Sequence, residues 1–234
     1  MRVYALTGEL VQTLGPSRED GRINNVDLVY GLTLANGEKV DLAVGSDRGL
    51  DVIRVWRIDA TAAEPLVEVT DPANATLVAT IPGPVSLWRD VKVYQDRAYS
   101  VSEGGQGIQV IDLSAVDTGV VSLETTVTGN GSDATHNVAI DEVSGYLYRT
   151  GGGGNGLRIY SLANPSSPQY VGSWSSRYVH DAQVVTYTSG PYAGRQLAFC
   201  CAGLGNGSGD TGLSIVDVTN KNFPFRIEQI AYPN

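Results

Sequence analysis

The stretch His180-Asp181-Ala182-Gln183 places a polar pair at the start of an alternating strand, and this arrangement occurs four times in the chain. The other three copies are Asn24-Asn25-Val26-Asp27, Arg89-Asp90-Val91-Lys92 and His136-Asn137-Val138-Ala139. Their second members are 65, 47 and 44 residues apart (90−25, 137−90 and 181−137). Repeats of this length with β-type alternation are typical of propeller blades. The repeat therefore predicts an all-β propeller rather than a single sandwich.

Each repeat has the same internal order of four strands. The polar pair opens the first strand, a turn leads to the second, and a glycine-rich loop leads to the third. A fourth, outer strand has weaker apolar patterning. The third strands end in an apolar-Asp/Ser-apolar signature, at residues 55–59, 108–113, 157–162 and 213–218. No segment keeps a 3.6-residue period, so we expect very little helix.

The strand signatures do not close a ring. The third-strand signature occurs a fifth time, at Val3-Tyr4-Ala5-Leu6, and residues 9–14 follow it as an outer strand. We therefore expect one domain over residues 1–234 with about five blades, of which four are complete and one is an N-terminal half blade. Three explanations of the missing inner hairpin stay open: truncation of a longer ring, a ring that tolerates a half blade, or oligomerisation. Self-association is favoured because exposed strand edges pair readily.

Composition narrows the possible partners. The net charge of −9 disfavours nucleic acid and anionic lipid, and it is compatible with cation binding. No run of 18 apolar residues exists, which predicts no membrane span, and the N-terminus does not read as a secretory signal. Cys200 and Cys201 are adjacent and point to opposite faces of a strand, so we expect small buried hydrophobes rather than a disulfide.

The second members of the four polar pairs form the first candidate site. In a propeller Asn25, Asp90, Asn137 and Asp181 would stand at one level around the axis. Calcium takes six to eight oxygen ligands from carboxylates, amides and carbonyls, which such a ring could supply. In the alternative interpretation, Asn and Asp hydrogen-bond to local backbone where each inner strand begins. Both interpretations stay open.

The first members of the pairs include the only two histidines of the chain, His136 and His180. Imidazole suits zinc, copper or nickel, and the alternative is a pair of hydrogen-bonded residues at the tunnel rim. Arg89 has the equivalent place in another blade, where it disfavours a nearby cation unless it pairs with an acid such as Glu103. No catalytic triad can be assembled from the spacing of these residues.

The first 71 residues resemble the β-propeller phytases. The resemblance is carried by Val3-Tyr4 and Gly8, Gly21 to Asp27, Lys39 to Ala43, Ser46-Asp47-Arg48, Val55 to Asp59 and Thr70-Asp71-Pro72. It implies calcium-dependent hydrolysis of phosphomonoesters, with Arg48 as a phosphate-binding residue and the Val26 carbonyl as part of a calcium site. From the residues alone, Arg48 could equally be a loop arginine paired with Asp47 or Asp51.

Residues 72–234 resemble bacterial extracellular proteins built of Leu-Val-Ile-Val-Asp repeats, the choice-of-anchor B group. This resemblance is carried by Ser86 to Tyr94, Ser102-Glu103, Gly107 to Val110, His136 to Ile140, Tyr178 to Gln183 and Leu213 to Thr219. Together the two resemblances imply a hybrid propeller that is extracellular or periplasmic.

We therefore expect a ligand- or metal-binding structural module with calcium near the axis and a phosphate or small anionic ligand. The alternative is a calcium-dependent phosphatase of phytase type. A third possibility is a hybrid selected for folding alone.

Overall fold

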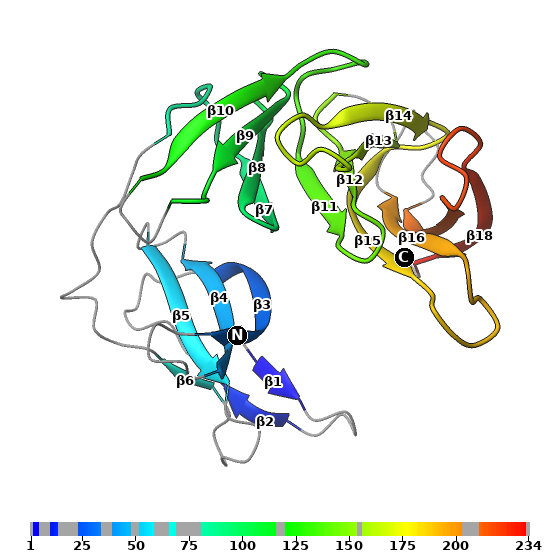
Figure 1. Cartoon of the computed structure of the whole chain (residues 1–234). Coiled ribbons are helices and arrows are strands. Elements are labelled where there is room, and N and C mark those ends of the chain that lie inside the picture. The colour runs from blue at the N-terminus through cyan, green and yellow to red at the C-terminus, as the bar shows by residue number, and fades with distance from the viewer. Residues whose placement is uncertain are drawn as a thin grey trace. The chain divides into compact units, whose positions relative to one another are not determined.

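The computed structural model describes residues 2–4, 10–13, 23–33, 39–47, 52–58, 66–68, 81–115, 120–153, 156–202 and 211–232. In these residues every regular element is a β-strand, and none forms a helix that could cross a membrane. The chain divides into two compact units, Met1–Thr76 and Leu77–Asn234 (Figure 1). The expected single domain stays a prediction.

The first unit contains a two-stranded and a four-stranded antiparallel sheet. In the smaller sheet β1 (Arg2–Tyr4) pairs with β2 (Leu10–Thr13), where the half blade was expected. The larger sheet has the order β3 (Ile23–Thr33), β4 (Lys39–Asp47), β5 (Val52–Ile58) and β6 (Leu66–Glu68). Both sheets agree with the strand order expected from the repeats.

The second unit contains three four-stranded antiparallel sheets whose strands follow chain order. The first sheet consists of β7 (Arg89–Tyr94), β8 (Arg97–Ser102), β9 (Ile108–Asp112) and β10 (Ser122–Val127). The second consists of β11 (Asn137–Asp141), β12 (Tyr146–Thr150), β13 (Leu157–Ser161) and β14 (Gln169–Trp174). The third consists of β15 (Val179–Thr186), β16 (Gln196–Ala202), β17 (Gly212–Asp217) and β18 (Phe225–Ala231).

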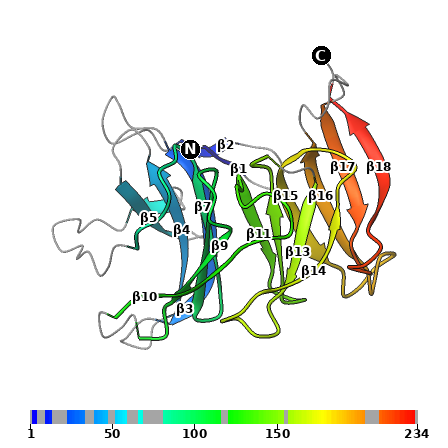
Figure 2. The same ribbon diagram turned by 90° about the horizontal axis from the view of Figure 1, so that it is seen from above.

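Each sheet of the second unit is a propeller blade. The first strands, β7, β11 and β15, lie on the inner side of the unit, and the fourth strands lie on its outer side (Figure 1). Figure 2 shows β15 to β18 following one another from the interior to the edge. The described residues thus confirm the all-β propeller fold class, with four four-stranded sheets and one two-stranded sheet.

The middle blade of the second unit, β11–β14, is buried on both faces because its residues alternate between two hydrophobic clusters. Val138, Leu147 and Tyr160 belong to one cluster with Tyr99 and Ile108 of the preceding blade. The neighbouring strand positions Ala139, Tyr148 and Ile159, which pair across the sheet, belong to the other cluster, shared with the following blade. Strand side chains point alternately to opposite faces, so one blade can contribute to two cores.

A glycine at the start of the third strand recurs in all three blades of this unit. A Cβ atom at Gly107, Gly156 or Gly212 would lie 2.0, 1.5 or 2.2 Å from a backbone carbonyl oxygen at or near the end of the outer strand. Only a residue without a side chain permits this approach. The glycine-rich loops seen in the sequence therefore end at a position that requires glycine.

The two cysteines differ in exposure, and this difference predicts their reactivity. Cys200 is fully buried in β16 as expected, whereas the expected burial of Cys201 is wrong, since it is exposed. Burial raises the pKa of Cys200 to about 12. Because the thiolate is the reactive form, a disulfide reagent at pH 8 should titrate one thiol in the native protein and two after unfolding. Cys201→Ser should abolish the native reaction; rapid native reaction of both thiols would contradict this prediction.

Candidate functional site

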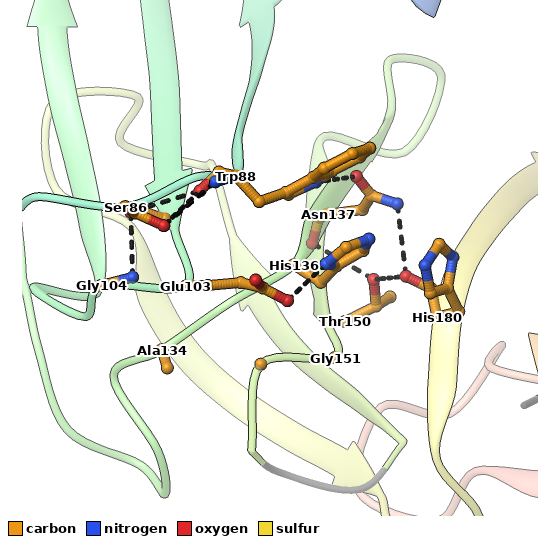
Figure 3. Close-up of polar contacts among 12 residues, drawn as sticks. Ser86, Trp88, Glu103, Gly104, Ala134, His136, Asn137, Thr150, Gly151 and His180 are labelled. Atoms are coloured by element: carbon orange, nitrogen blue, oxygen red, sulfur yellow. Dashed lines mark hydrogen bonds and ion pairs between the residues drawn. The ribbon is translucent and has the colours of Figure 1, made fainter. Parts of the chain in front are cut away.

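Polar and aromatic side chains gather in the second unit where its inner strands begin (Figure 3). Trp88 precedes β7, Glu103 follows β8, His136 precedes β11, and His180 lies near the start of β15. In an antiparallel sheet the first strand begins at the same end of the sheet at which the second strand finishes. Three blades therefore present these four residues, here named the histidine site, at one end of the unit.

His136 is held in place from several sides. Its Nδ1 donates to Glu103 Oε1 over 2.6 Å, and its ring stacks on Trp88 with centroids 4.5 Å apart and planes 8° from parallel. Its backbone N–H donates to the Thr150 carbonyl over 2.9 Å, and a Cβ at Gly151 would meet its Cβ at 2.6 Å. Its Nε2 is buried and has no hydrogen-bond partner among the residues that the structure describes. Such an orphaned polar atom is uncommon in a folded protein.

The ring of His180 lies next to that of His136 (Figure 3). The two imidazole centroids are 4.1 Å apart, and the ring planes are tilted by 50°. The pKa of His180 is lowered, first because partial burial disfavours the imidazolium and second because a positive charge on the neighbouring His136 ring would repel it. Since the lowered pKa favours the neutral ring, His180 offers a nitrogen lone pair at neutral pH.

Two residues of the predicted calcium ring, Asp90 and Asn137, form hydrogen bonds with neighbouring protein groups. Asp90 accepts from the backbone N–H groups of Val91 and, in the next blade, Val138, over 2.9 and 3.0 Å. Asn137 donates to the His180 carbonyl of the following blade over 3.3 Å, and its Oδ1 accepts from Trp88 over 3.4 Å.

Fewer contacts are described for the other residues of the predicted calcium site. Asp181 accepts from the adjacent Ala182 N–H over 2.8 Å. Asn25 and Val26 lie in β3 of the first unit, where Val26 pairs with Gly45 of β4. The contacts of Asp90, Asn137 and Asp181 agree with the interpretation of the pairs as strand-entry residues. In the part of the chain that the structure describes, no three His, Cys, Asp or Glu side chains group as a metal site, and calcium binding stays a prediction.

Of the two arginines that the sequence suggests as ligand-binding residues, Arg48 and Arg89, only the second lies in the described part of the chain. Arg48 lies outside the described residues. Arg89 is exposed and donates to the Pro84 carbonyl, whereas the acid considered as its partner, Glu103, contacts His136. The loop after β8 therefore directs the Glu103 carboxylate towards the next blade. Arg89, His180 and Glu103 remain open to solvent at this end of the unit.

Two buried arginines, Arg149 and Arg158, support the site and escaped the sequence analysis. Arg149 is fully buried and donates to Thr135, Tyr160 and the Ser132 carbonyl over 2.8, 2.9 and 2.8 Å. Arg158 donates to the same Ser132 carbonyl over 2.8 Å. Both guanidinium groups therefore brace the loop that leads into His136. The sequence does contain a signal for them, because Arg149 shares a strand face with Leu147, and Arg158 shares one with Tyr160.

The pKa of Arg158 reflects this crowding of cations. Burial, and then the charge of Arg149, lower the pKa of Arg158 to about 10. Arg149 and Arg158 face each other across β12 and β13. Among the described residues, these guanidinium groups donate to carbonyl and hydroxyl oxygens.

Comparison with known proteins extends the resemblance seen in the sequence. The chain matches the family Phytase over residues 1–148. The match continues beyond residue 71, where the resemblance was expected to end, and it includes Trp88, Glu103 and His136. A comparison with curated proteins found no match. The resemblance of residues 72–234 to the Leu-Val-Ile-Val-Asp repeat proteins stays a prediction. Because the match covers more than half of the chain and the described strands form propeller blades, the chain belongs to the Phytase family of β-propeller proteins.

Proposed function

We propose that this chain is a binding propeller for a small phosphorylated ligand and that calcium takes part in the binding. The family match carries this proposal, because the resemblance to phytases implies phosphomonoester ligands and calcium. The match includes Arg48 and Val26, the two positions at which the resemblance implies phosphate and calcium contacts.

Two arginines are the proposed phosphate-binding groups, one in each unit. A guanidinium group presents a planar fork of donors that matches phosphate oxygens in pairs. Arg89 supports the proposal by its exposure at the end of the blades where the inner strands begin. Arg48 supports it by its place in the family match. Each is proposed as a phosphate ligand in its own right.

A second candidate function is calcium-dependent hydrolysis of phosphomonoesters, which the same family match favours. It differs from the first in that bound ligand would release inorganic phosphate. We also propose an extracellular or periplasmic location and self-association through exposed strand edges, on the grounds given by the resemblances and the strand count.

Calorimetric titration of the untagged full chain with phytate, at calcium concentrations that keep phytate soluble, tests the proposal. Arg48→Ala and Arg89→Ala should each weaken phytate binding at its own site at least tenfold, because a hydrogen bond to a charged group contributes about 1.5–3 kcal/mol. Arg226→Ala, on the outer strand β18, is the matched control and should leave binding unchanged. A calcium chelator should weaken binding as well.

Measuring inorganic phosphate in the same titration mixtures separates the two functions. Phytate binding without phosphate release supports the binding propeller, whereas calcium-dependent release of phosphate establishes the hydrolase. Absence of binding, or binding that neither arginine variant changes, would contradict the phosphate site.

A further inference from the structure

We propose that His136 and His180 together bind a divalent transition-metal ion such as copper, nickel or zinc. The site lies at the start of β11 and β15 and goes beyond the proposed phosphate and calcium functions. Its first support is the buried Nε2 of His136, which has no hydrogen-bond partner among the described residues. Its second is the neighbouring ring of His180, whose centroid lies 4.1 Å away.

Glu103 prepares His136 as a metal ligand. Because Glu103 Oε1 accepts the hydrogen of His136 Nδ1, the lone pair of the neutral imidazole is placed on Nε2. Metal-binding histidines usually donate their other N–H to a carboxylate or carbonyl in this way, which fixes the tautomer and raises the basicity of the ligand. The contact with Glu103 thus leaves Nε2, which is unpartnered within the described part of the chain, as the nitrogen that can bind a metal.

The surroundings of His136 restrict its movement. Trp88 covers one ring face with nearly parallel planes, and the backbone of Gly151 approaches the Cβ so closely that no side chain would fit there. A ligand held in one orientation before the metal arrives loses little conformational entropy on binding. His136 is therefore the fixed ligand of the pair.

His180 is the adjustable ligand. Figure 3 shows one of its ring nitrogens on the side facing His136. A metal bonded to both imidazoles at about 2.0–2.1 Å would place the centroids about 4.5–5 Å apart, so the His180 ring must swing outwards slightly. Its exposure permits this rotation. Imidazole nitrogen favours copper, nickel and zinc over calcium, which prefers oxygen.

Copper titration monitored by electron paramagnetic resonance tests the proposal on the untagged full chain. The protein has only two histidines, so any imidazole signal must come from this pair. A Cys201→Ser background removes the exposed thiol. We expect one copper ion per chain with the hyperfine pattern of two imidazole nitrogens. His180→Asn and His136→Asn should each leave one such nitrogen and weaken binding at least tenfold.

Glu103→Gln distinguishes a positioning role from a ligand role. It should weaken copper binding by about 10–100-fold while the two-imidazole pattern is kept. Glu228→Gln on the outer strand β18 is the matched control and should change neither property. His180 is exposed, so His180→Asn gives a valid result even if the buried His136→Asn variant does not fold. A wild-type spectrum without two imidazole nitrogens, or the same spectrum in His180→Asn, would overturn the proposal.

Discussion

Replacement of Arg149 by leucine is expected to lower the free energy of unfolding by about 3–5 kcal/mol. Leucine fills part of the space, but Thr135 and Tyr160 lose the hydrogen bonds that Arg149 donates to them, whereas the Ser132 carbonyl keeps its hydrogen bond from Arg158. Leaving buried polar groups unpaired costs about 1–3 kcal/mol each. The loss of one charge beside Arg158 offsets part of this cost.

Urea unfolding followed by circular dichroism measures this effect. Arg149→Lys keeps the charge but not the guanidinium fork, and its stability should lie between those of wild type and Arg149→Leu. Arg226→Leu, on the exposed outer strand, should change stability by less than about 0.5 kcal/mol. If Arg149→Leu lost less than about 1 kcal/mol, the bracing role of the guanidinium would be wrong.

Replacement of Gly156 by alanine is expected to cost about 2–4 kcal/mol. Gly156 has φ of +73°, and a Cβ there would lie 1.5 Å from the Trp174 carbonyl oxygen. Alanine therefore faces a strained backbone conformation and must also push β14 away from β13. Trp174 is buried in the cluster shared by two blades, so that displacement would disturb the packing there.

Gly190→Ala separates the two causes. Gly190 has φ of +76°, close to that of Gly156, but no atom lies within 4 Å of the position its Cβ would take. This control should therefore show the backbone cost alone, about 1–2 kcal/mol. Thermal and urea unfolding of the two variants give the difference. Equal losses would show that the approach of the Trp174 carbonyl does not matter.

The strand order could be predicted because it depends on local patterns. Alternation, turn residues and a recurring third-strand ending are read within a few residues of one another, and the half blade β1–β2 follows from the same signature. The proximity of His136 and His180 could also be anticipated, since the repeat places both one residue before an inner-strand position.

The contacts of the candidate site depend on how neighbouring blades approach, which no local pattern gives. The sequence suggests Glu103 only as a partner of Arg89, and the loop after β8 directs it to His136 instead. Trp88 was not singled out from the sequence, and the structure shows it stacked on the imidazole of His136. Arg149 and Arg158 share strand faces with apolar residues, but the sequence does not show the carbonyl groups that surround them.

The hydrogen bonds from Asp90 and Asn137 have a consequence for how such proteins evolve. Each joins a side chain of one blade to the main chain of the next, at the Val138 N–H and the His180 carbonyl. Main-chain groups are common to nearly all amino acids, and only proline is barred from the Val138 position because it lacks the N–H. A receiving blade can therefore change its side chains, or be exchanged for a blade of other ancestry, while the joint is preserved.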